Sequence, residues 1–278
     1  MKTICLLDRN IISDIKRFHD TGSSQNISLA KAQDKPYNII SSLSSTLEGG
    51  KGNLQTLPEF HETTEEETRL ISFFYKRARV DSSFLKANTL SSYTALYQDI
   101  KSRLELFSPL ISLVQSTFGL HNTPSKARAR VLEDILVEFA SSNKIPLTGV
   151  PAIGIISAIY GNPHSRKILK PQTSELSEKE KSDAVYNTLY DLEIAKRLIM
   201  LKATVLRDNS VNIKLITRDQ GLKKFIDCVS ESHCAQVTEN MVGDTTVNFE
   251  IPLDDQLFPT LRTDEDKLAL RDRMKSWS

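Results

Sequence analysis

The chain of 278 residues is 39% hydrophobic and 26% charged, the composition of a globular protein that can bury a core. Its 36 Lys and Arg residues balance 35 Asp and Glu residues, so the net charge of +1 favours no class of partner. No apolar stretch approaches the roughly 18 residues of a membrane-spanning helix, and no signal-peptide pattern opens the sequence. The three cysteines (Cys5, Cys228 and Cys234) lack metal-ligand spacing, and their odd number argues against a disulfide framework. These features predict a cytoplasmic protein without a membrane partner.

Residues 1–58 are expected to form the first part of an α/β core. The apolar run at residues 3–7 predicts a buried strand, and apolar residues at helical spacing predict a helix over residues 10–18. After a polar connection, a second core element runs through residues 36–48 and ends at the glycine cluster of residues 49–53. The apolar residues of this second element lie on one face: Ile39, Ile40, Leu43 and Leu47.

Residues 59–181 are expected to form a helical insertion or cap. Long helical patterns cover residues 65–80, 91–118 and 124–142. Thr123 is the expected N-cap of the third of these helices, with Pro124 in its first turn. The apolar piece at residues 150–159 carries a strand signal, and residues 169–181 are predicted to be an exposed linker.

Residues 182–278 return to an α/β pattern and are expected to complete the core. Helices are predicted at residues 183–205, 220–229 and 264–277. Strands are predicted at residues 213–217, 235–237 and 247–251. The expected fold is therefore a central parallel sheet flanked by helices, with a large helical insertion in the middle of the chain.

Three aspartates stand at positions in these core elements that suit metal chemistry. Asp8 follows the first strand, Asp219 follows the strand at residues 213–217, and Asp191 lies in the helix before that strand. The carboxyl ends of parallel strands meet at one edge of a sheet, where ligands collect. Carboxylates brought together there repel one another unless a cation lies between them, and Mg²⁺ and Mn²⁺ prefer such oxygen ligands. The pattern favours a phosphodiesterase that uses a metal-activated water.

Each of these residues also has a purely structural interpretation. Asp8 and Asp219 both precede a predicted helix, where aspartate is a favoured N-cap. Asp191 can be a solvated helix position, and Glu193 points to another side of the same helix and is only a reserve ligand. Asn10 can serve turn chemistry. The functional and structural interpretations differ in whether the carboxylates converge in space.

The motifs around these aspartates resemble those of the PIN-like nucleases. Residues 6–10 (Leu-Leu-Asp-Arg-Asn) are similar to the opening strand of that family, which ends in an aspartate followed by asparagine two residues later. Residues 190–195 (Tyr-Asp-Leu-Glu-Ile-Ala) look like its late helix, and residues 215–222, with their Thr-Arg-Asp, look like its closing strand. The resemblance covers roughly residues 1–53 and 182–251. It implies a PIN-like core, Mg²⁺ or Mn²⁺ as cofactor, and nucleic acid as substrate, with RNA favoured over DNA.

The family pattern also implies a glutamate associated with the second core element. Glu48 is the expected position, because it closes the element at residues 36–48. A rival alignment places that element at residues 150–155, where Gly154 would occupy the acidic position and the site would lack one carboxylate. With Glu48, the implied catalytic and metal-binding set is Asp8, Glu48, Asp191 and Asp219.

Further side chains are candidates for contacts with phosphate groups or with the metal ligands. Asn10 and Thr217 neighbour the two strand-end aspartates, and Lys126, Arg128 and Arg130 form a basic cluster that can equally be a solvated helix face. The leading hypothesis is a metal-dependent nuclease, more specifically a ribonuclease. The competing hypothesis is a catalytically degenerate PIN-like subunit that binds or scaffolds a larger nucleic-acid-processing or defence complex, with the helical middle as an interaction surface.

Overall fold

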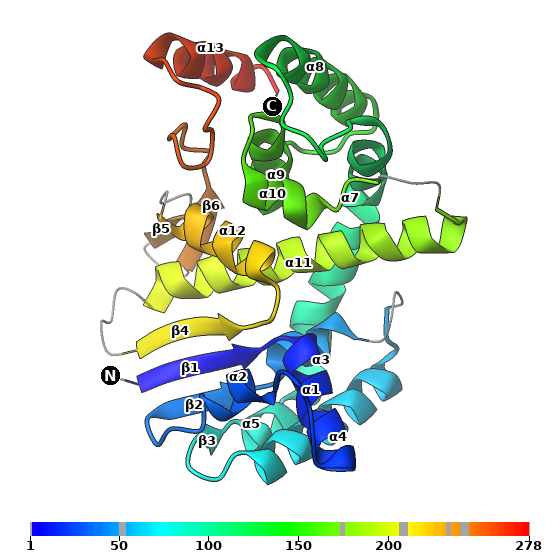
Figure 1. Cartoon of the computed structure of the whole chain (residues 1–278), viewed down its shortest axis with the longest axis vertical. Helices are drawn as coiled ribbons and strands as arrows, with labels where there is room; N and C mark the ends of the chain where they lie inside the picture. The colour runs from blue at the N-terminus through cyan, green and yellow to red at the C-terminus, as the bar shows by residue number, and fades with distance from the viewer. Residues whose placement is uncertain are drawn as a thin grey trace. The chain divides into compact units, whose positions relative to one another are not determined.

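The computed structural model describes residues 2–49, 54–172, 176–205, 211–231, 235–239 and 245–277 (Figure 1). Its strands are β1 (Lys2–Leu7), β2 (Asn38–Ser41), β3 (Arg79–Val80), β4 (Val211–Ile216), β5 (Ala235–Glu239) and β6 (Thr245–Phe249). Its helices are α1 (Arg9–Thr21), α2 (Ile27–Lys31), α3 (Leu43–Glu48), α4 (Leu57–Phe74), α5 (Ser82–Ala87), α6 (Thr89–Ser92), the π-helical η1 (Tyr93–Tyr97), α7 (Gln98–Thr117), α8 (Lys126–Ser142), α9 (Gly149–Ile159), α10 (Pro163–Leu169), α11 (Glu178–Val205), α12 (Gln220–Glu231) and α13 (Asp264–Met274). The strands predicted at residues 3–7 and 213–217 are confirmed, as are the helices predicted at residues 10–18, 183–205, 220–229 and 264–277.

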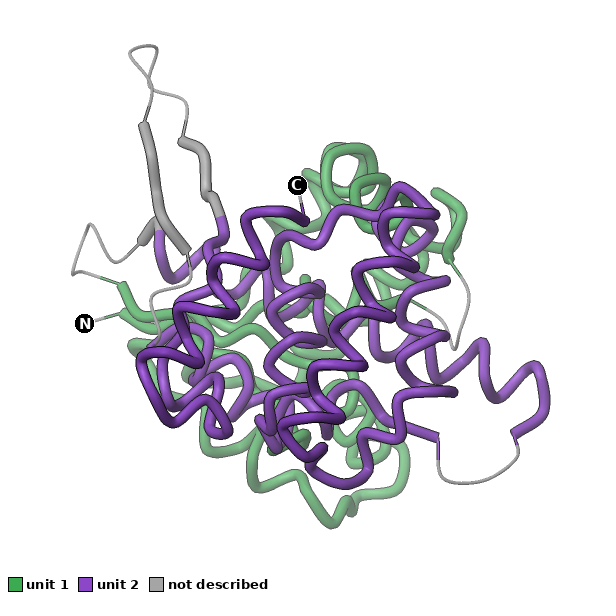
Figure 2. Tube along the Cα trace, turned by 90° about the horizontal axis from the view of Figure 1, so that it is seen from above, with its two compact units in different colours: residues 1–102, 204–220 green, residues 103–203, 221–278 purple. Residues whose placement is uncertain are grey.

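The chain divides into two compact units (Figure 2). Unit 1 comprises residues 1–102 and 204–220, and unit 2 comprises residues 103–203 and 221–278. The predicted core boundaries, at residues 58 and 182, differ from these limits. The difference arises because the predicted insertion contains β3, which pairs with β2 in the sheet of unit 1.

Unit 1 contains a four-stranded sheet in the order β3-β2-β1-β4, and all of its strand pairs are parallel. In the centre of this sheet, Leu7 of β1 pairs with Ile216 of β4, and Leu6 of β1 pairs with Ser41 of β2. The predicted class, an α/β protein with a parallel sheet flanked by helices, is thereby confirmed. The chain moves outward from β1 through β2 to β3 and then returns to the other side of β1 as β4 (Figure 1). In parallel sheets, such a reversal of strand order marks the position where ligands bind, at the carboxyl ends of the strands, here β1 and β4.

The core of unit 1 lies between one face of this sheet and helices α1, α2 and α4. Its buried residues are Cys5, Leu7, Ile11, Ile12, Ile15, Ala30, Ile40, Ile71, Tyr75 and Ile216. Leu6 and Leu215 point to the opposite face, because side chains alternate along a strand, and they are buried as well. Burial on both faces explains the uninterrupted apolar run that marks β1 in the sequence.

Two apolar segments form elements other than those expected. Residues 36–48, predicted as one element, contain the strand β2 followed almost directly by the short helix α3. Residues 150–159, which carried a strand signal, lie within α9 and are all buried. A helix buried on every side lacks amphipathic periodicity, so its apolar run resembles that of a buried strand. Gly154, which the rival alignment places at the acidic position, lies in this helix and has a packing role, since a Cβ atom there would lie 3.1 Å from the Leu192 side chain.

Two helices of the predicted insertion begin at other residues than expected. α4 begins at Leu57, ahead of the predicted start at residue 65, because Thr56 and Glu59 form a capping box in which the Thr56 N–H donates to the Glu59 carboxylate at 2.7 Å. α8 is capped by Ser125, whose hydroxyl accepts from the Arg128 N–H at 3.3 Å, and not by Thr123. Local hydrogen-bonding partners set both helix starts more strongly than hydrophobic periodicity does.

Unit 2 is mainly helical. The predicted late strands are confirmed as β5 and β6, but they form a separate antiparallel pair and do not extend the parallel sheet. The buried Glu133 carboxylate of α8 accepts from Arg273 of α13 at 2.6 Å and also from the Tyr160 hydroxyl. Among the described helices of either unit, none is long and apolar enough to cross a membrane.

Candidate active site

Asp8 lies at the carboxyl end of the central strand, directly after β1. Its backbone N–H donates to the carbonyl oxygen of Ile216 at 3.0 Å, which extends the β1–β4 ladder by one residue. Its Oδ1 accepts from the Arg9 N–H at 2.7 Å, and its Oδ2 accepts from the side chains of Asn10 and Thr217. The helix-cap interpretation of Asp8 is therefore confirmed. The residue is only 6% exposed, so the cap is also a buried carboxylate at the carboxyl edge of the sheet.

Thr217 connects the two strand ends. Its hydroxyl donates to Asp8, and it accepts from the Asn10 side-chain amide at 3.1 Å and from the Asp219 backbone N–H at 2.9 Å. A hydroxyl group has one donor and two acceptor positions, so these contacts use all of them. Asn10 also accepts from the Arg218 backbone N–H at 3.1 Å. The two motifs found in the sequence thus form one hydrogen-bonded cluster, although Asn10 and Thr217 are 207 residues apart.

Asp8 and Asp219 interact electrostatically. Burial is the main cause that raises the pKa of Asp8, and the negative charge of Asp219 raises it further, while hydrogen bonds from Thr217, Arg9 and Asn10 oppose the rise. A cation between the two carboxylates would remove this repulsion. A carboxylate offers about four lone-pair positions, and the contacts described above take one on Oδ1 and two on Oδ2. The donor set of hard oxygens and the like charges fit a divalent metal.

The loop that carries Asp219 has a further contact with α1. The Arg218 guanidinium lies 3.4 Å from Oδ2 of Asp14, and the other oxygen of Asp14 accepts from the Ser24 hydroxyl at 3.1 Å. Asp14 is 2% exposed. Sequence reasoning missed this residue, although it lies within the buried stripe of α1 next to Ile15. The ion pair fixes the loop between Thr217 and Asp219 against α1.

Glu48 is the last residue of α3, which packs on β1, α1 and α4 within unit 1. The expected second acid therefore belongs to the same unit as Asp8 and Asp219, and its side chain is half-buried. The preceding residues Ser45 and Thr46 are buried, and they attach α3 to the neighbouring helix α4.

That attachment is made by Glu67, a buried acid of α4 that sequence reasoning missed. Its carboxylate accepts from the hydroxyls of Ser45 and Thr46 at 2.7 and 2.9 Å, and it lies 3.8 Å from the Arg9 guanidinium. Burial raises the pKa of Glu67 to about 7, against the opposing effect of these partners. The sequence places Glu67 in an acidic run, but its spacing from the buried Phe60 and Ile71 puts it on the inner face of α4.

Another buried acid, Asp81, directly follows β3. Its backbone N–H donates to the Ile40 carbonyl oxygen at 3.1 Å. Burial raises the pKa of Asp81 to about 6, and a hydrogen bond with Ser41 partly offsets that rise. Each strand of the sheet thus has a polar residue at its carboxyl edge. Asp81 follows β3, Ser41 is the last residue of β2, Asp8 follows β1, and Thr217 follows β4. A strand of two residues has no sequence pattern, so Asp81 could not be recognised as a strand-end residue.

Asp191 belongs to unit 2 and has an ion-pair partner there. Its Oδ2 accepts from the Lys170 ammonium group at 2.6 Å. The reserve residue Glu193 is 3% exposed and lies 3.9 Å from Arg103 and 3.8 Å from Lys196. The predicted ligand Asp191 and the reserve residue Glu193 therefore each lie beside a cation of unit 2.

The predicted phosphate-binding cluster on α8 also lies in unit 2. Lys126 pairs with Asp266 at 2.5 Å, and Arg130 pairs with Asp134 at 2.8 Å. Arg128 is exposed. Two of the three predicted basic contacts thus form ion pairs with acids of the same unit.

The candidate cation site within unit 1 is the carboxylate pair Asp8 and Asp219. Within the part of the chain that the structure describes, no group of three or more His, Cys, Asp or Glu side chains is arranged to hold a metal ion. Magnesium commonly uses one or two protein carboxylates and completes its shell with water and phosphate oxygens. Comparisons of the chain with protein-family profiles, with curated proteins and with solved structures find no match.

Proposed function

We propose that this chain is a divalent-metal-dependent nuclease of the PIN-like type that cleaves RNA. The observation that carries the proposal is the cluster in which the buried Asp8 is hydrogen bonded to Asn10 and Thr217 and repelled by Asp219. This cluster joins the two strand-end motifs on which the family resemblance rests. It also lies where parallel sheets bind ligands, at the carboxyl ends of β1 and β4.

In the proposed site, Asp8 and Asp219 provide oxygen ligands for the cation. Thr217 and Asn10 orient Asp8, and their donated hydrogen bonds favour its ionised form. When bound, Mg²⁺ or Mn²⁺ would neutralise charge on the scissile phosphate and lower the pKa of a water molecule. Glu48 is the proposed further ligand or the base that orients and deprotonates this water. The role of Asp191 as a metal ligand is a prediction from the motif at residues 190–195.

The remaining parts of the proposal come from the sequence. The family resemblance favours RNA over DNA, and the three cysteines, whose odd number argues against a disulfide framework, favour a reducing, cytoplasmic setting. The helical segment at residues 59–181 is proposed to shape substrate access or to bind a protein partner. Arg128 is an exposed member of the basic cluster on α8, as is Lys126, and it is the proposed phosphate contact.

The test measures cleavage of end-labelled single-stranded RNA and DNA by the wild type and by the variants Asp8→Asn and Asp219→Asn, with Mn²⁺ or with EDTA. We expect each substitution to lower the Mn²⁺-dependent cleavage rate by at least about 100-fold. Loss of an outer-shell partner of a metal ligand already lowers activity by about 10- to 100-fold, and loss of the ligand itself should lower it further. Asp99→Asn, which changes an exposed acid of α7 in unit 1, is the matched control and retains activity. Binding of Mn²⁺, followed by electron paramagnetic resonance, should weaken in the same two variants. Equal cleavage by the wild type and Asp8→Asn contradicts the proposal.

An inactive binding or scaffold subunit is the second candidate, and the Asp191–Lys170 ion pair favours it. The Lys170 ammonium group neutralises a carboxylate that the family pattern assigns to the metal. This candidate predicts that the wild type and Asp8→Asn bind labelled RNA with equal affinity and that neither cleaves it with Mn²⁺. A gain of cleavage in Lys170→Gln would instead show that the ion pair alone restrains an active site.

A further inference from the structure

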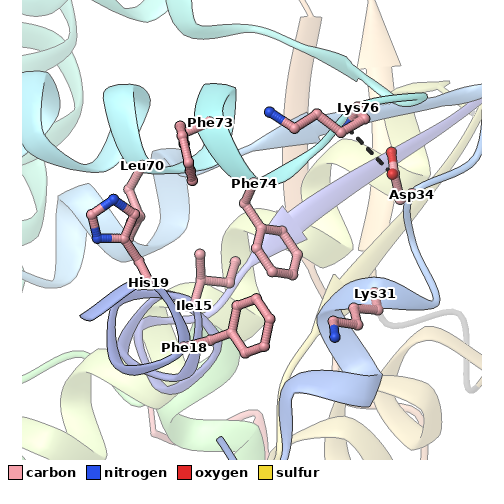
Figure 3. A pocket seen from close by; sticks show the side chains of 9 residues that line it. All are labelled: Ile15, Phe18, His19, Lys31, Asp34, Leu70, Phe73, Phe74 and Lys76. Carbon is pink, nitrogen blue, oxygen red and sulfur yellow. Dashed lines mark hydrogen bonds between the residues drawn. The ribbon is translucent and has the colours of Figure 1, made fainter. Parts of the chain in front are cut away.

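A pocket of aromatic rings and lysines lies between α1, α2 and α4 of unit 1 (Figure 3). Its volume is about 430 Å³, and it is lined by Ile15, Phe18, His19, Lys31, Asp34, Leu70, Phe73, Phe74 and Lys76. The residues that α1 contributes lie roughly two to three helical turns beyond Asp8. The pocket is therefore separate from the candidate active site, which lies at the other end of α1.

The rings of the pocket offer stacking surface at its mouth. Phe73 is 60% exposed and meets the ring of His19 edge-on, with 5.1 Å between the ring centroids. Phe18 and Phe74 form a second edge-to-face pair at 6.0 Å, and Figure 3 shows these rings on facing sides of the pocket. An apolar ring exposed to this extent gains free energy when a planar ligand covers it.

Two lysines give the pocket positive charge. The ammonium groups of Lys31 and Lys76 lie over phenyl rings of the pocket, 4.3 and 4.7 Å from the ring centroids. The acid of the lining, Asp34, accepts hydrogen bonds from the three backbone N–H groups of residues 76–78, at 3.2, 2.7 and 2.8 Å. These hydrogen bonds hold the carboxylate on the backbone. The two lysines outnumber this one acid in the lining, and among these contacts their ammonium groups have only aromatic partners.

We propose that this pocket binds a nucleotide, with the base stacked on Phe73 and the phosphate paired with Lys31 and Lys76. Base stacking on aromatic side chains together with lysine–phosphate pairing is the chemistry by which proteins hold single nucleotides. The pocket volume lies within the range of about 300–1,000 Å³ that is usual for small-molecule sites. A free mononucleotide and one nucleotide of a single strand present the same groups. The proposal is independent of the proposed nuclease activity, because it concerns binding alone.

The test measures two equilibrium affinities in EDTA. One probe is AMP, followed by calorimetry, and the other is a fluorescein-labelled 2′-O-methyl oligoadenylate of ten nucleotides, followed by anisotropy. We expect Phe73→Leu and the double variant Lys31→Gln/Lys76→Gln to weaken binding of at least one probe about tenfold or more. Phe84→Leu, a 65% exposed phenylalanine of α5, and Lys101→Gln, an exposed lysine of α7, are the matched controls and bind like the wild type.

The two probes distinguish the source of the nucleotide. Loss of AMP affinity assigns the pocket to a free nucleotide, and loss of oligonucleotide affinity without AMP binding assigns it to a strand. Both affinities are measured in EDTA and report binding alone, so a failure of the nuclease proposal leaves this measurement intact. The proposal is overturned if neither probe binds the wild type, or if Phe73→Leu and the double lysine variant match their controls with both probes.

Discussion

At the scale of residues, the two strand-end aspartates differ in their surroundings. Asp8 is buried and receives three hydrogen bonds, whereas Asp219 is half-buried and follows the loop that Arg218 holds against α1. Thr217 contacts both aspartates: its hydroxyl group donates to the Asp8 carboxylate and accepts from the Asp219 backbone N–H. A single hydroxyl group therefore couples the position of one carboxylate to that of the other.

We expect Thr217→Val to destabilise the protein by about 1–3 kcal/mol. The isosteric methyl group leaves Asp8 without one donor and leaves the Asp219 N–H and the Asn10 amide without their acceptor. The free energy of unfolding in urea at pH 7 measures the loss. Thr217→Ser keeps the hydroxyl group and serves as the control, and equal stability of the Val and Ser variants would contradict the role assigned to this hydroxyl.

The electrostatic coupling of the two carboxylates makes a separate prediction. Asp219→Asn removes a negative charge that raises the pKa of Asp8, so we expect the pKa of Asp8 to fall toward its ordinary value while remaining raised by burial. Asp219→Glu keeps the charge and is the control. Titration of the Asp8 carboxyl carbon by NMR measures the shift. Added Mg²⁺ should lower the apparent pKa of Asp8 in the wild type and less so in Asp219→Asn, and an unchanged pKa in Asp219→Asn without metal contradicts the coupling.

At the scale of elements, α3 is held in place by a buried acid. Burial raises the pKa of Glu67 to about 7, so the folded state binds a proton more tightly than the unfolded chain does. The stability that this preference contributes is fully present below the unfolded pKa, near 4.5, and is lost as the pH rises through about 7. The unfolding free energy of the wild type should therefore decrease over this pH window.

The variant Glu67→Gln removes the titrating group, so its unfolding free energy should lack this decrease, which amounts to up to about 3 kcal/mol. Urea unfolding at several pH values between 4.5 and 7.5 measures both profiles. Glu62→Gln changes an exposed acid of the same helix and should follow the wild-type profile. Parallel profiles of the wild type and Glu67→Gln would show that Glu67 does not titrate in this window.

The sequence predicts those elements whose burial leaves a clear pattern. β1 and β4 have apolar runs that end in polar motifs, and the candidates Asp8, Asn10, Thr217 and Asp219 could be selected from these motifs. The structure brings these four residues together. α9 could not be assigned, because a fully buried helix has no polar face. Glu67 and Asp14 were missed because charged residues are mostly exposed, and only their helical phase indicates burial.

At the scale of the whole molecule, unit 1 is assembled from two chain segments. Residues 1–102 contain β1, β2 and β3, and residues 204–220 contain β4 with Thr217 and Asp219. β4 pairs with β1 along its whole length, from Lys2 and Val211 to Leu7 and Ile216. Without β4 the strand β1 would become an edge strand, and its unpaired backbone groups would be open to solvent or to other chains.

We therefore expect a fragment of residues 1–102 to lack a cooperative thermal transition in circular dichroism. Joining residues 211–220 to it through about 20 Gly and Ser residues, which reach about 25 Å on average, should restore a cooperative transition by returning β4 to the sheet. The matched control is the same joined chain with Ile213→Asp, which places a charge at a buried position of β4. If the fragment of residues 1–102 unfolds as cooperatively as the joined chain, β4 is dispensable for the fold and the closing motif is not part of the folding unit. If only the joined chain unfolds cooperatively, the segment that brings Thr217 to Asp8 is also the one that completes the sheet, so assembly of the candidate site and folding of unit 1 are one event.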